Sequence, residues 1–388
     1  MSRIFIKQVP RLVRQRLPHV QTLGAAAVVA TLEDLAYLRE RDDSVKEVFT
    51  HCISRALALL PELRVTGIIR ALFAYKRAEI TSSNFLEEVS RFLLEECGAG
   101  QPFENMFTSC TANDILLLYK AFVVNDFINV RLHALCMNML QKQTEHMLPS
   151  DCCIFFKTHT KCIEASKRNF ATDDAERVTL KDALHPPLAR EITLRFLRRR
   201  DAIPEDITSF VEWLVPGSQY YGLSLDLSEQ IASFYRILAQ NPPIFNINHI
   251  HRLVQSTCLL HAYMPEQYHA VIKHFIVSLL HEAERRSDVH DYQSALTTFY
   301  ALSSIEFGEF ELLQGMLYCI VNNVDQVKDL CKVQDIIRRR IYEKRNLHKT
   351  AIAADFTFTI ERYPPSIQAL KVSTYEMNPH CHAASRNC

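Results

Sequence analysis

Apolar residues recur every three or four positions along most of the chain, with polar residues between them. This spacing places the apolar side chains on one face of an α-helix. The pattern is clearest in four segments that align with one another and end in Ala followed by a large apolar or aromatic residue: 66–75, 113–122, 254–263 and 293–302. Weaker copies lie at 153–157, 191–197 and 229–238. We therefore expect one type of helix to recur along the chain.

A second amphipathic helix is predicted after several of these segments, at 83–96, 130–144 and 266–285. A single hairpin of two helices cannot bury its apolar stripe alone, whereas stacked hairpins can. The expected fold class is therefore all-α, an α-solenoid of stacked antiparallel helical hairpins. The alternative is an irregular helical bundle with accidental self-similarity.

The spacing of the copies gives the length of the repeat. The equivalent points chosen in the first five copies are Ile68, Ile115, Ile154, Ile192 and Ile231. They are separated by 47, 39, 38 and 39 residues, and Ser256 and Ala295 are again 39 apart. Ile231 and Ser256 are only 25 apart. The pattern predicts a unit of about 38 residues, with either one truncated unit or an error of register at this point.

The N-terminal segment differs from the rest. Residues 1–27 contain five Arg or Lys residues and no Asp or Glu, and apolar residues lie between the charges. This composition is typical of a mitochondrial presequence, with cleavage expected between Leu17 and Val29 and a matrix location for the mature protein. A basic first helix of the fold is the alternative. The solenoid is predicted over 28–370, with a polar loop near 168–187 and a polar tail at 371–388.

Composition narrows the range of functions. Only 8 of the 388 residues are glycine, which disfavours phosphate-binding loops and tight β-hairpins. The 44 basic residues equal the 44 acidic ones, so loss of the presequence would leave a net charge of −5, and contact with RNA would need a local basic patch. No apolar stretch is long enough to span a membrane. The cysteines are scattered and are expected to be reduced, with four of them at apolar helix positions: Cys52, Cys136, Cys258 and Cys319.

The usual catalytic motifs are missing. The sequence lacks G-x-x-x-x-G-K-[ST], G-x-G-x-x-G and G-x-S-x-G, and His281-Glu282 is followed by no second zinc-binding His. Two groups of Cys and His resemble metal ligands: Cys152, Cys153, His159 and Cys162, and His380, Cys381, His382 and Cys388. The first group lies among phenylalanines in a predicted core helix, and the second in the polar tail. We expect no metal site, no cofactor and no enzymatic activity.

Two basic clusters are the candidate RNA-binding sites. The stretch 327–349 holds eight Lys or Arg residues against three Asp or Glu residues, with Tyr342 and His348 among them. Cations and stacking rings are what single-stranded RNA requires; the alternatives are a solvated helix face or contact with an acidic protein. The candidate residues are Arg195, Arg198, Arg199, Arg338, Arg339, Arg340, Lys344, Arg345 and Lys349.

The repeat of about 38 residues, its stripe ending in Ala and an aromatic residue, and the presequence resemble the helical-repeat proteins of organellar RNA metabolism. The likeness covers about 32–323 and is closest to the heptatricopeptide repeats of FAST-kinase-like proteins, as in 113–122. Pentatricopeptide-repeat proteins are similar in architecture, and the sequence also resembles helical-repeat subunits of trypanosomatid RNA-editing complexes. The RAP domain that often ends such proteins has no counterpart here.

This resemblance implies a non-catalytic scaffold in a mitochondrial RNA editing or processing complex. Its expected partners are protein subunits of a ribonucleoprotein complex and RNA, either messenger or guide RNA. A structural or assembly factor of the mitochondrial ribosome and an enzyme of unrecognised type are the alternatives.

Overall fold

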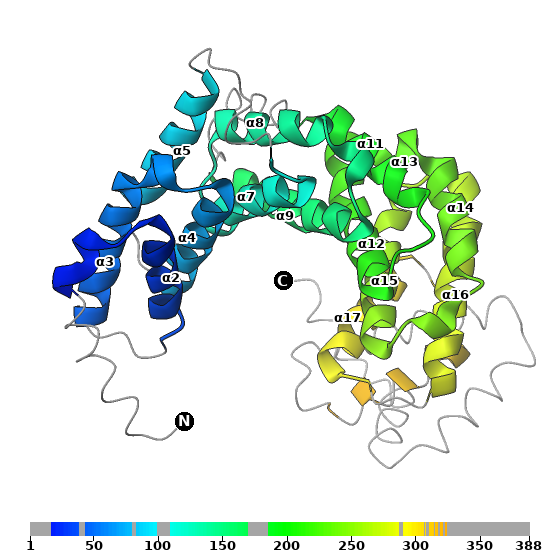
Figure 1. The fold of residues 1–388 in the computed structure, drawn as a ribbon. Coiled ribbons are helices and arrows are strands. Elements are labelled where there is room, and N and C mark those ends of the chain that lie inside the picture. The colour runs from blue at the N-terminus through cyan, green and yellow to red at the C-terminus, as the bar shows by residue number, and fades with distance from the viewer. Residues whose placement is uncertain are drawn as a thin grey trace, which may run out of the picture. The chain divides into compact units, whose positions relative to one another are not determined.

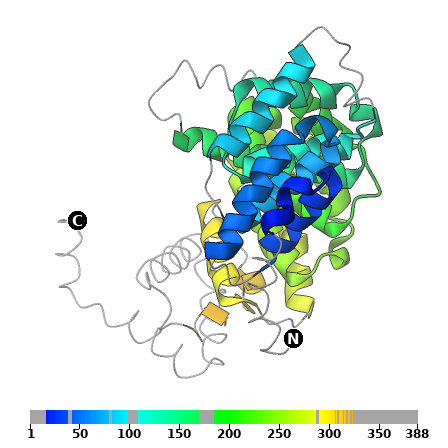
Figure 2. The same ribbon diagram turned by 60° about the vertical axis from the view of Figure 1, so that its left-hand side comes forward.

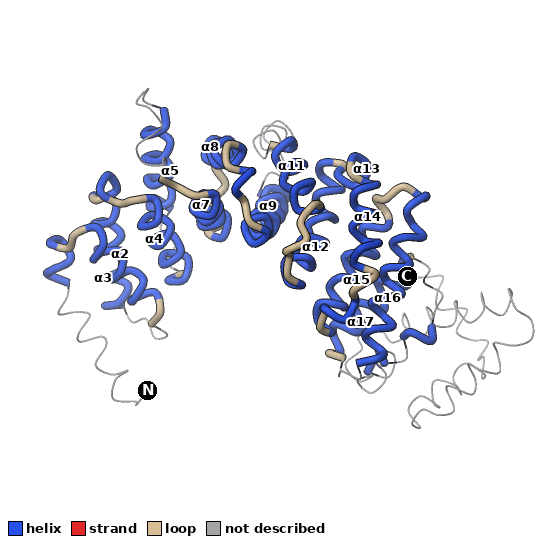
Figure 3. The backbone as a smooth tube through the Cα atoms, turned by 45° about the vertical axis from the view of Figure 1, so that its right-hand side comes forward, coloured by secondary structure: helices blue, strands red, loops and turns tan. Residues whose placement is uncertain are grey.

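The computed structural model describes residues 17–38, 43–79, 83–98, 109–169, 185–286 and 290–305, together with short stretches between 307 and 323. Every regular element in these ranges is a helix, so the all-α prediction is confirmed (Figure 3). The chain divides into two compact units, Met1–Leu223 and Ser224–Cys388. The sequence predicts one continuous domain over 28–370.

The first unit contains two sets of helices. Its elements are η1 (Leu17–Thr22), α2 (Ala25–Ala36), α3 (Asp43–Ala58), η2 (Leu60–Glu62), α4 (Val65–Ala78), α5 (Ser83–Gly98), α7 (Ala112–Val124), α8 (Val130–Gln141), η3 (Thr144–His146), α9 (Pro149–Asn169), α11 (Pro186–Leu197) and α12 (Pro204–Tyr221). Helix α2 lies against α4, α4 against α7, α7 against α9 and α9 against α12 (Figure 1, Figure 2). We call these five the first helices.

The intervening helices pack around this row. Helix α3 lies against α2 and α5, α5 against α8, α8 against α7, and α11 against both α9 and α12. The predicted segments 66–75 and 113–122 fall inside α4 and α7, and the predicted second helices 83–96 and 130–144 correspond to α5 and α8.

Local sequence explains where these helices begin. At α7, the Thr111 side chain accepts a hydrogen bond from the Asp114 backbone N–H while the Asp114 carboxylate accepts one from the Thr111 N–H, a capping box. The Asn129 side chain caps α8 by accepting a hydrogen bond from the Leu132 N–H.

An aromatic cluster forms the core where α9, α11 and α12 meet. Phe155 and Phe156 of α9, Phe196 of α11, and Phe210 and Trp213 of α12 are each at most 1% exposed. The Trp213 ring stacks on that of Phe156, with centroids 5.5 Å apart. The phenylalanines therefore place the 153–157 segment in a core helix, as predicted.

Polar contacts tie each first helix to the next. The Arg70 guanidinium of α4 donates to the Glu33 carboxylate of α2, at 2.9 Å for Nε. Lys76 Nζ of α4 lies 3.4 Å from Oδ2 of Asp126, which lies just beyond α7. Lys157 Nζ of α9 lies 3.2 Å from Glu205 Oε1 of α12. Each of these surface pairs contributes little to stability. Such a pair occurs at every interface between successive first helices except that of α7 with α9, where the polar contact, between Tyr119 and His159, is buried.

The second unit comprises α14 (Ser228–Leu238), η4 (Pro242–Ile244), α15 (Ile247–His261), η5 (Glu266–Tyr268), α16 (His269–Arg286), α17 (Tyr292–Ser304) and η6 (Phe310–Leu313). The short α13 (Leu223–Asp226) crosses the boundary between the units. Helix α15 lies against α16 and α17, and α14 lies against α16.

The helix neighbours correct the register chosen from the sequence. Ile192 lies on α11, beside the row of first helices rather than in it. Ile231 lies on α14, which packs against α16, whereas Ser256 and Ala295 lie on the neighbouring helices α15 and α17. The interval of 25 residues therefore joins α14, which contacts α16, to α15, which contacts both α16 and α17. Ile154 is half-exposed, whereas the other chosen isoleucines are buried.

The predicted domain limits fall partly on described residues. Within the predicted presequence 1–27, η1 packs against α3 and Val20 is 1% exposed, so cleavage near Val29 would remove a packed element. The predicted loop 168–187 is helical at both ends, because α9 continues to Asn169 and α11 begins at Pro186. The tail 371–388 lies outside the described residues.

Candidate functional site

The structure describes only one of the two predicted basic clusters. The residues from Arg338 to Lys349 lie outside the described part of the chain. Arg195 lies in the last turn of α11, Arg198 is its C-cap, and Arg199 follows directly. Positive charge at this end also complements the helix dipole. Of the candidate residues, the structure therefore brings together only Arg195, Arg198 and Arg199.

Two of these arginines form contacts within the chain. The Arg195 Nε donates to Glu191 Oε1 at 3.1 Å, and the same oxygen accepts a hydrogen bond from Thr144 Oγ1 at 2.9 Å. Arg199 Nη2 donates to the Met147 carbonyl at 2.6 Å. These bonds tie the end of α11 to the η3 region, a structural role that sequence analysis missed. Arg198 is exposed and has no ion pair within the described ranges.

The first helices leave one face uncovered. On α4, α7 and α9 the exposed and half-exposed positions recur every three or four residues, as expected for one free face on each helix. Basic residues at these positions are Arg70, Lys76, Arg77, Lys120, Lys157 and Lys161, acidic ones are Asp114 and Glu164, and apolar ones are Phe73, Leu117, Val124 and Ile154.

Some of the positive charge on this face is already paired. Arg70 pairs with Glu33 and Lys157 with Glu205, and the Arg77 guanidinium lies 4.0 Å from the centre of the Tyr37 ring. Lys120 and Lys161 have no ion pair in the described part of the chain. The face thus combines lysines without an ion pair, which attract phosphates, with half-exposed apolar side chains.

A polar cluster lies where α7, α8, α9 and α12 meet, with Tyr119, His133, His159 and Cys162 fully buried and Tyr221 half-buried. His159 forms hydrogen bonds through both ring nitrogens, to the Tyr119 hydroxyl at 3.2 Å and the Tyr221 hydroxyl at 2.9 Å. His133 Nδ1 lies 3.4 Å from Cys162 Sγ, and its Nε2 has no partner among the described residues.

Burial keeps this cluster neutral. It lowers the pKa of His133 to about 4, and burial together with His133 lowers the pKa of His159 to about 3. Burial also raises the pKa of the Cys162 thiol to about 12 and the pKa of the Tyr119 hydroxyl well above its usual value. A protonated thiol is a poor nucleophile and metal ligand, so these groups are suited to structure rather than to catalysis.

Burial also explains the Cys residues of α9 that resemble metal ligands in the sequence. Cys152 and Cys153 are buried in α9 beside the cluster, and burial raises the pKa of Cys152 to about 12. Among the described residues, no group of three or more Cys, His, Asp or Glu side chains is placed to hold a metal ion. The 380–388 grouping lies outside those residues. Cys52, Cys136 and Cys258 are buried as predicted, and Cys319 is half-buried.

Histidine pairs also occur in the second unit. His251 Nε2 lies 3.0 Å from His290 Nδ1, and His251 Nδ1 lies 2.8 Å from Thr298 Oγ1. The His261 and His269 rings stack with centroids 3.8 Å apart, and the His269 Nε2 donates to the Met264 carbonyl at 2.9 Å. These contacts join α15 to α17 and to the start of α16, so these histidines are interhelical.

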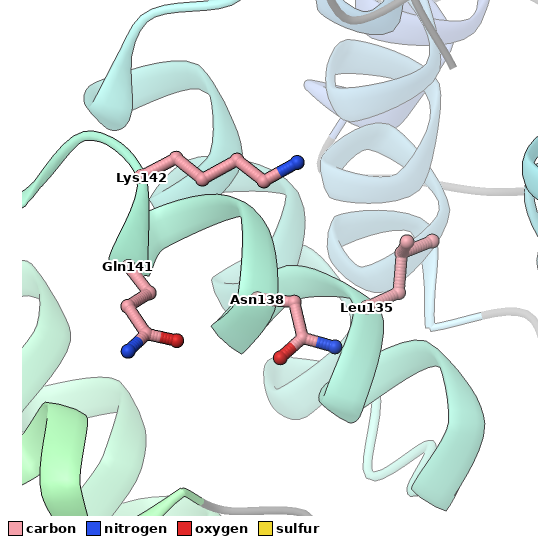
Figure 4. A pocket seen from close by; sticks show the side chains of 4 residues that line it. All are labelled: Leu135, Asn138, Gln141 and Lys142. Carbon is pink, nitrogen blue, oxygen red and sulfur yellow. The ribbon is translucent and has the colours of Figure 1, made fainter. Parts of the chain in front are cut away.

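The surface also has an open depression at the end of α8. Its volume is about 430 Å³, and its described lining consists of Leu135, Asn138, Gln141 and Lys142 (Figure 4). Lys142 is the sole titratable side chain among these four, so the described lining contains no pair of acid and base side chains.

Comparison with known proteins adds no family. No protein-family model matches the chain, and no curated protein matches it significantly. The described part of the chain is all-helical. No helix in the described ranges is long and apolar enough to span a bilayer.

Proposed function

We propose that this chain is a non-catalytic scaffold of a mitochondrial RNA editing or processing complex. The observation that carries the proposal is the uncovered face of α4, α7 and α9, which presents basic and half-exposed apolar residues side by side. Such a face offers apolar area for protein partners and positive charge for RNA.

We also propose that the helices form an α-solenoid with a repeat of about 38 residues. The contacts of α2, α4, α7, α9 and α12, each with the next, support this in the first unit. In such an architecture each hairpin contacts mainly its neighbours, and the free face provides an extended binding surface.

RNA contact is assigned to the basic stretch 338–349 and to the uncovered face. The arginines of α11 contribute less to this assignment than the sequence alone predicts, because Arg195 and Arg199 are engaged with Glu191 and the Met147 carbonyl. On the uncovered face, Lys120 and Lys161 are free to meet phosphates. The basic, acid-free N-terminus supports the mitochondrial location.

The test is to purify the tagged full-length protein from mitochondria with and without ribonuclease. A scaffold retains its protein partners after ribonuclease treatment, and components of an RNA editing or processing complex are expected among them. Ribosomal proteins as the retained partners would instead favour the ribosome assembly factor. Absence of any retained partner would contradict a scaffold role.

RNA contact is tested separately with charge reversals. Replacing Arg338, Arg339 and Arg340 with Glu should weaken the binding of single-stranded RNA and make it fall less steeply with salt, since fewer counterions are released. The matched control makes the same charge reversal at Lys46 on α3, Arg91 on α5 and Arg131 on α8, three exposed basic residues outside the stretch. Equal affinity of the Arg variant and the unaltered protein would contradict direct contact.

A further inference from the structure

One edge of the first unit brings three helix ends together. Contacts between α9 and α12 run in the same order along both helices: Cys153 Sγ donates to the Asp206 carbonyl at 3.4 Å, Phe156 packs on Phe210, and His159 bonds to Tyr221. The two helices are therefore parallel, and their N-termini lie at the same edge. The bond from Arg199 Nη2 to the Met147 carbonyl brings the C-terminus of α11 to that edge too.

Two large apolar side chains are exposed at this edge. Leu148 directly precedes α9 and is 57% exposed, and Ile203 directly precedes α12 and is 59% exposed. The backbone of both is fixed, because the Leu148 N–H donates to Asp151 Oδ2 at 2.9 Å and the Ile203 carbonyl accepts from the Ile207 N–H at 3.0 Å. Exposed apolar side chains on a fixed backbone offer a partner contact area with little backbone left to order on binding.

The same edge carries free positive charge. Arg195 is paired with Glu191, and Arg199 lies 3.7 Å from Asp201. Arg198 and Arg200, in contrast, are exposed and have no ion pair within the described ranges. Arginine is enriched at protein interfaces because its planar head binds carboxylates in a bidentate fashion.

We propose that Leu148, Ile203, Arg198 and Arg200 form a docking edge for a protein partner, through a segment that combines apolar side chains with Asp or Glu residues. This inference deepens the scaffold function proposed above and rests on it. Charge complementarity selects an acidic segment, and the two aliphatic side chains favour protein over RNA. Single-stranded RNA binds through phosphates and through bases stacked on aromatic rings, and these four residues include no aromatic ring.

The experiment places a photo-crosslinking residue, p-benzoylphenylalanine, at Ile203 of the tagged full-length protein and irradiates it in mitochondrial extract. The matched control carries the same residue at Tyr37, which is 68% exposed elsewhere in the first unit. The expected product is a crosslink to a protein at Ile203, absent at Tyr37, whose crosslinked peptide is rich in Asp or Glu and apolar residues by mass spectrometry. Replacing Arg198 and Arg200 with Glu should lower its yield by about tenfold.

Three results would overturn the proposal: a ribonuclease-sensitive crosslink to RNA, a crosslinked peptide that is basic, or no protein crosslink at Ile203 above the Tyr37 control. Folding of each variant is checked by the fluorescence of the buried Trp213. A second variant, Leu148→Ser with Ile203→Ser, should lose the crosslinked partner in co-purification. The control Leu225→Ser, at a 66% exposed position on α13, should keep it. If the whole protein retains ribonuclease-resistant partners but neither experiment involves this edge, the docking edge fails and the scaffold function stands.

Discussion

Replacing Tyr119 with Phe tests whether the buried polar cluster stabilises the first unit. The change removes only the hydroxyl oxygen, which lies 3.2 Å from His159 Nδ1 in a site where both residues are 0% exposed. The ring nitrogen would then be buried without a partner, and such a group costs about 1–3 kcal/mol. We expect the free energy of unfolding to fall by this amount. For a unit of this size, each kcal/mol corresponds to about 2–4 °C in Tm.

The chain provides its own probe for this measurement. Trp213 is its only tryptophan, is 1% exposed, and lies with its ring centroid 5.5 Å from that of His159. Urea unfolding followed by tryptophan fluorescence therefore reports on this region directly. The control is Tyr37→Phe, the same chemical change at a 68% exposed position, which should stay within about 0.5 kcal/mol of the unaltered protein. A Tyr119→Phe variant equally close to the unaltered protein would refute the reasoning.

Three further predictions concern the first unit. Acid should destabilise this unit, because the pKa values of about 4 for His133 and about 3 for His159 lie below the ordinary value of about 6.5. Below pH 6.5 the unfolded chain therefore binds protons that the folded chain does not bind. The free energy of unfolding, measured in urea, should fall by about 1.4 kcal/mol per pH unit for each histidine until the pH reaches the pKa of that histidine in the folded chain. Gly217→Ala should cost about 1–3 kcal/mol in the same assay, because its Cβ would lie 2.7 Å from Leu223 Cδ1 and 3.2 Å from Trp213 Cε2. Thr111→Ala should cost about 1 kcal/mol by removing the capping box of α7.

Each of these has a control. His133→Leu should reduce the loss of stability between pH 6.5 and 4.5 by about half, and a pH profile that stays flat in the unaltered protein would contradict the neutral histidines. Gly67→Ala places a Cβ 3.2 Å from Leu63 Cδ2, the end of a side chain that can shift by a few tenths of an ångström, and should stabilise α4 by up to about 1 kcal/mol. An equal loss at both glycines would contradict the packing argument. Thr66→Ala, at an exposed position inside α4, should change stability less than Thr111→Ala does.

The sequence predicted helices well where the pattern of apolar residues was strong. Segments 66–75 and 113–122 fall within α4 and α7, each of which buries eight residues, because an apolar stripe with a close-packed Ala has few other ways to be covered. The register failed at Ile192 and Ile231, since an amphipathic helix looks alike wherever it lies in a hairpin. Its neighbours distinguish the two positions, and they are set by tertiary contacts.

The site was less predictable. The arginines near 195 were visible as a cluster. Their hydrogen bonds were not, because Arg199 donates to the carbonyl of Met147 and the Glu191 partner of Arg195 is held by Thr144, and both Met147 and Thr144 lie some 50 positions earlier. The pairing of His159 with Tyr119 and Tyr221 was likewise missed, although His133-x-x-Cys136 and His159-x-x-Cys162 place polar groups on apolar helix faces at a spacing of three. Polar residues within such stripes were the available signal.

The polar ties between successive first helices have a consequence for how the protein is made. Glu33 and Arg70 are 37 residues apart, and Tyr119 and His159 are 40 apart. Each interface can therefore close once about one more hairpin has left the ribosome, without waiting for the distant C-terminus. Short separations of this kind keep the entropy of loop closure small. The first unit is thus built to fold from its N-terminal side onward while synthesis continues, with each new hairpin covering the apolar edge left by the one before.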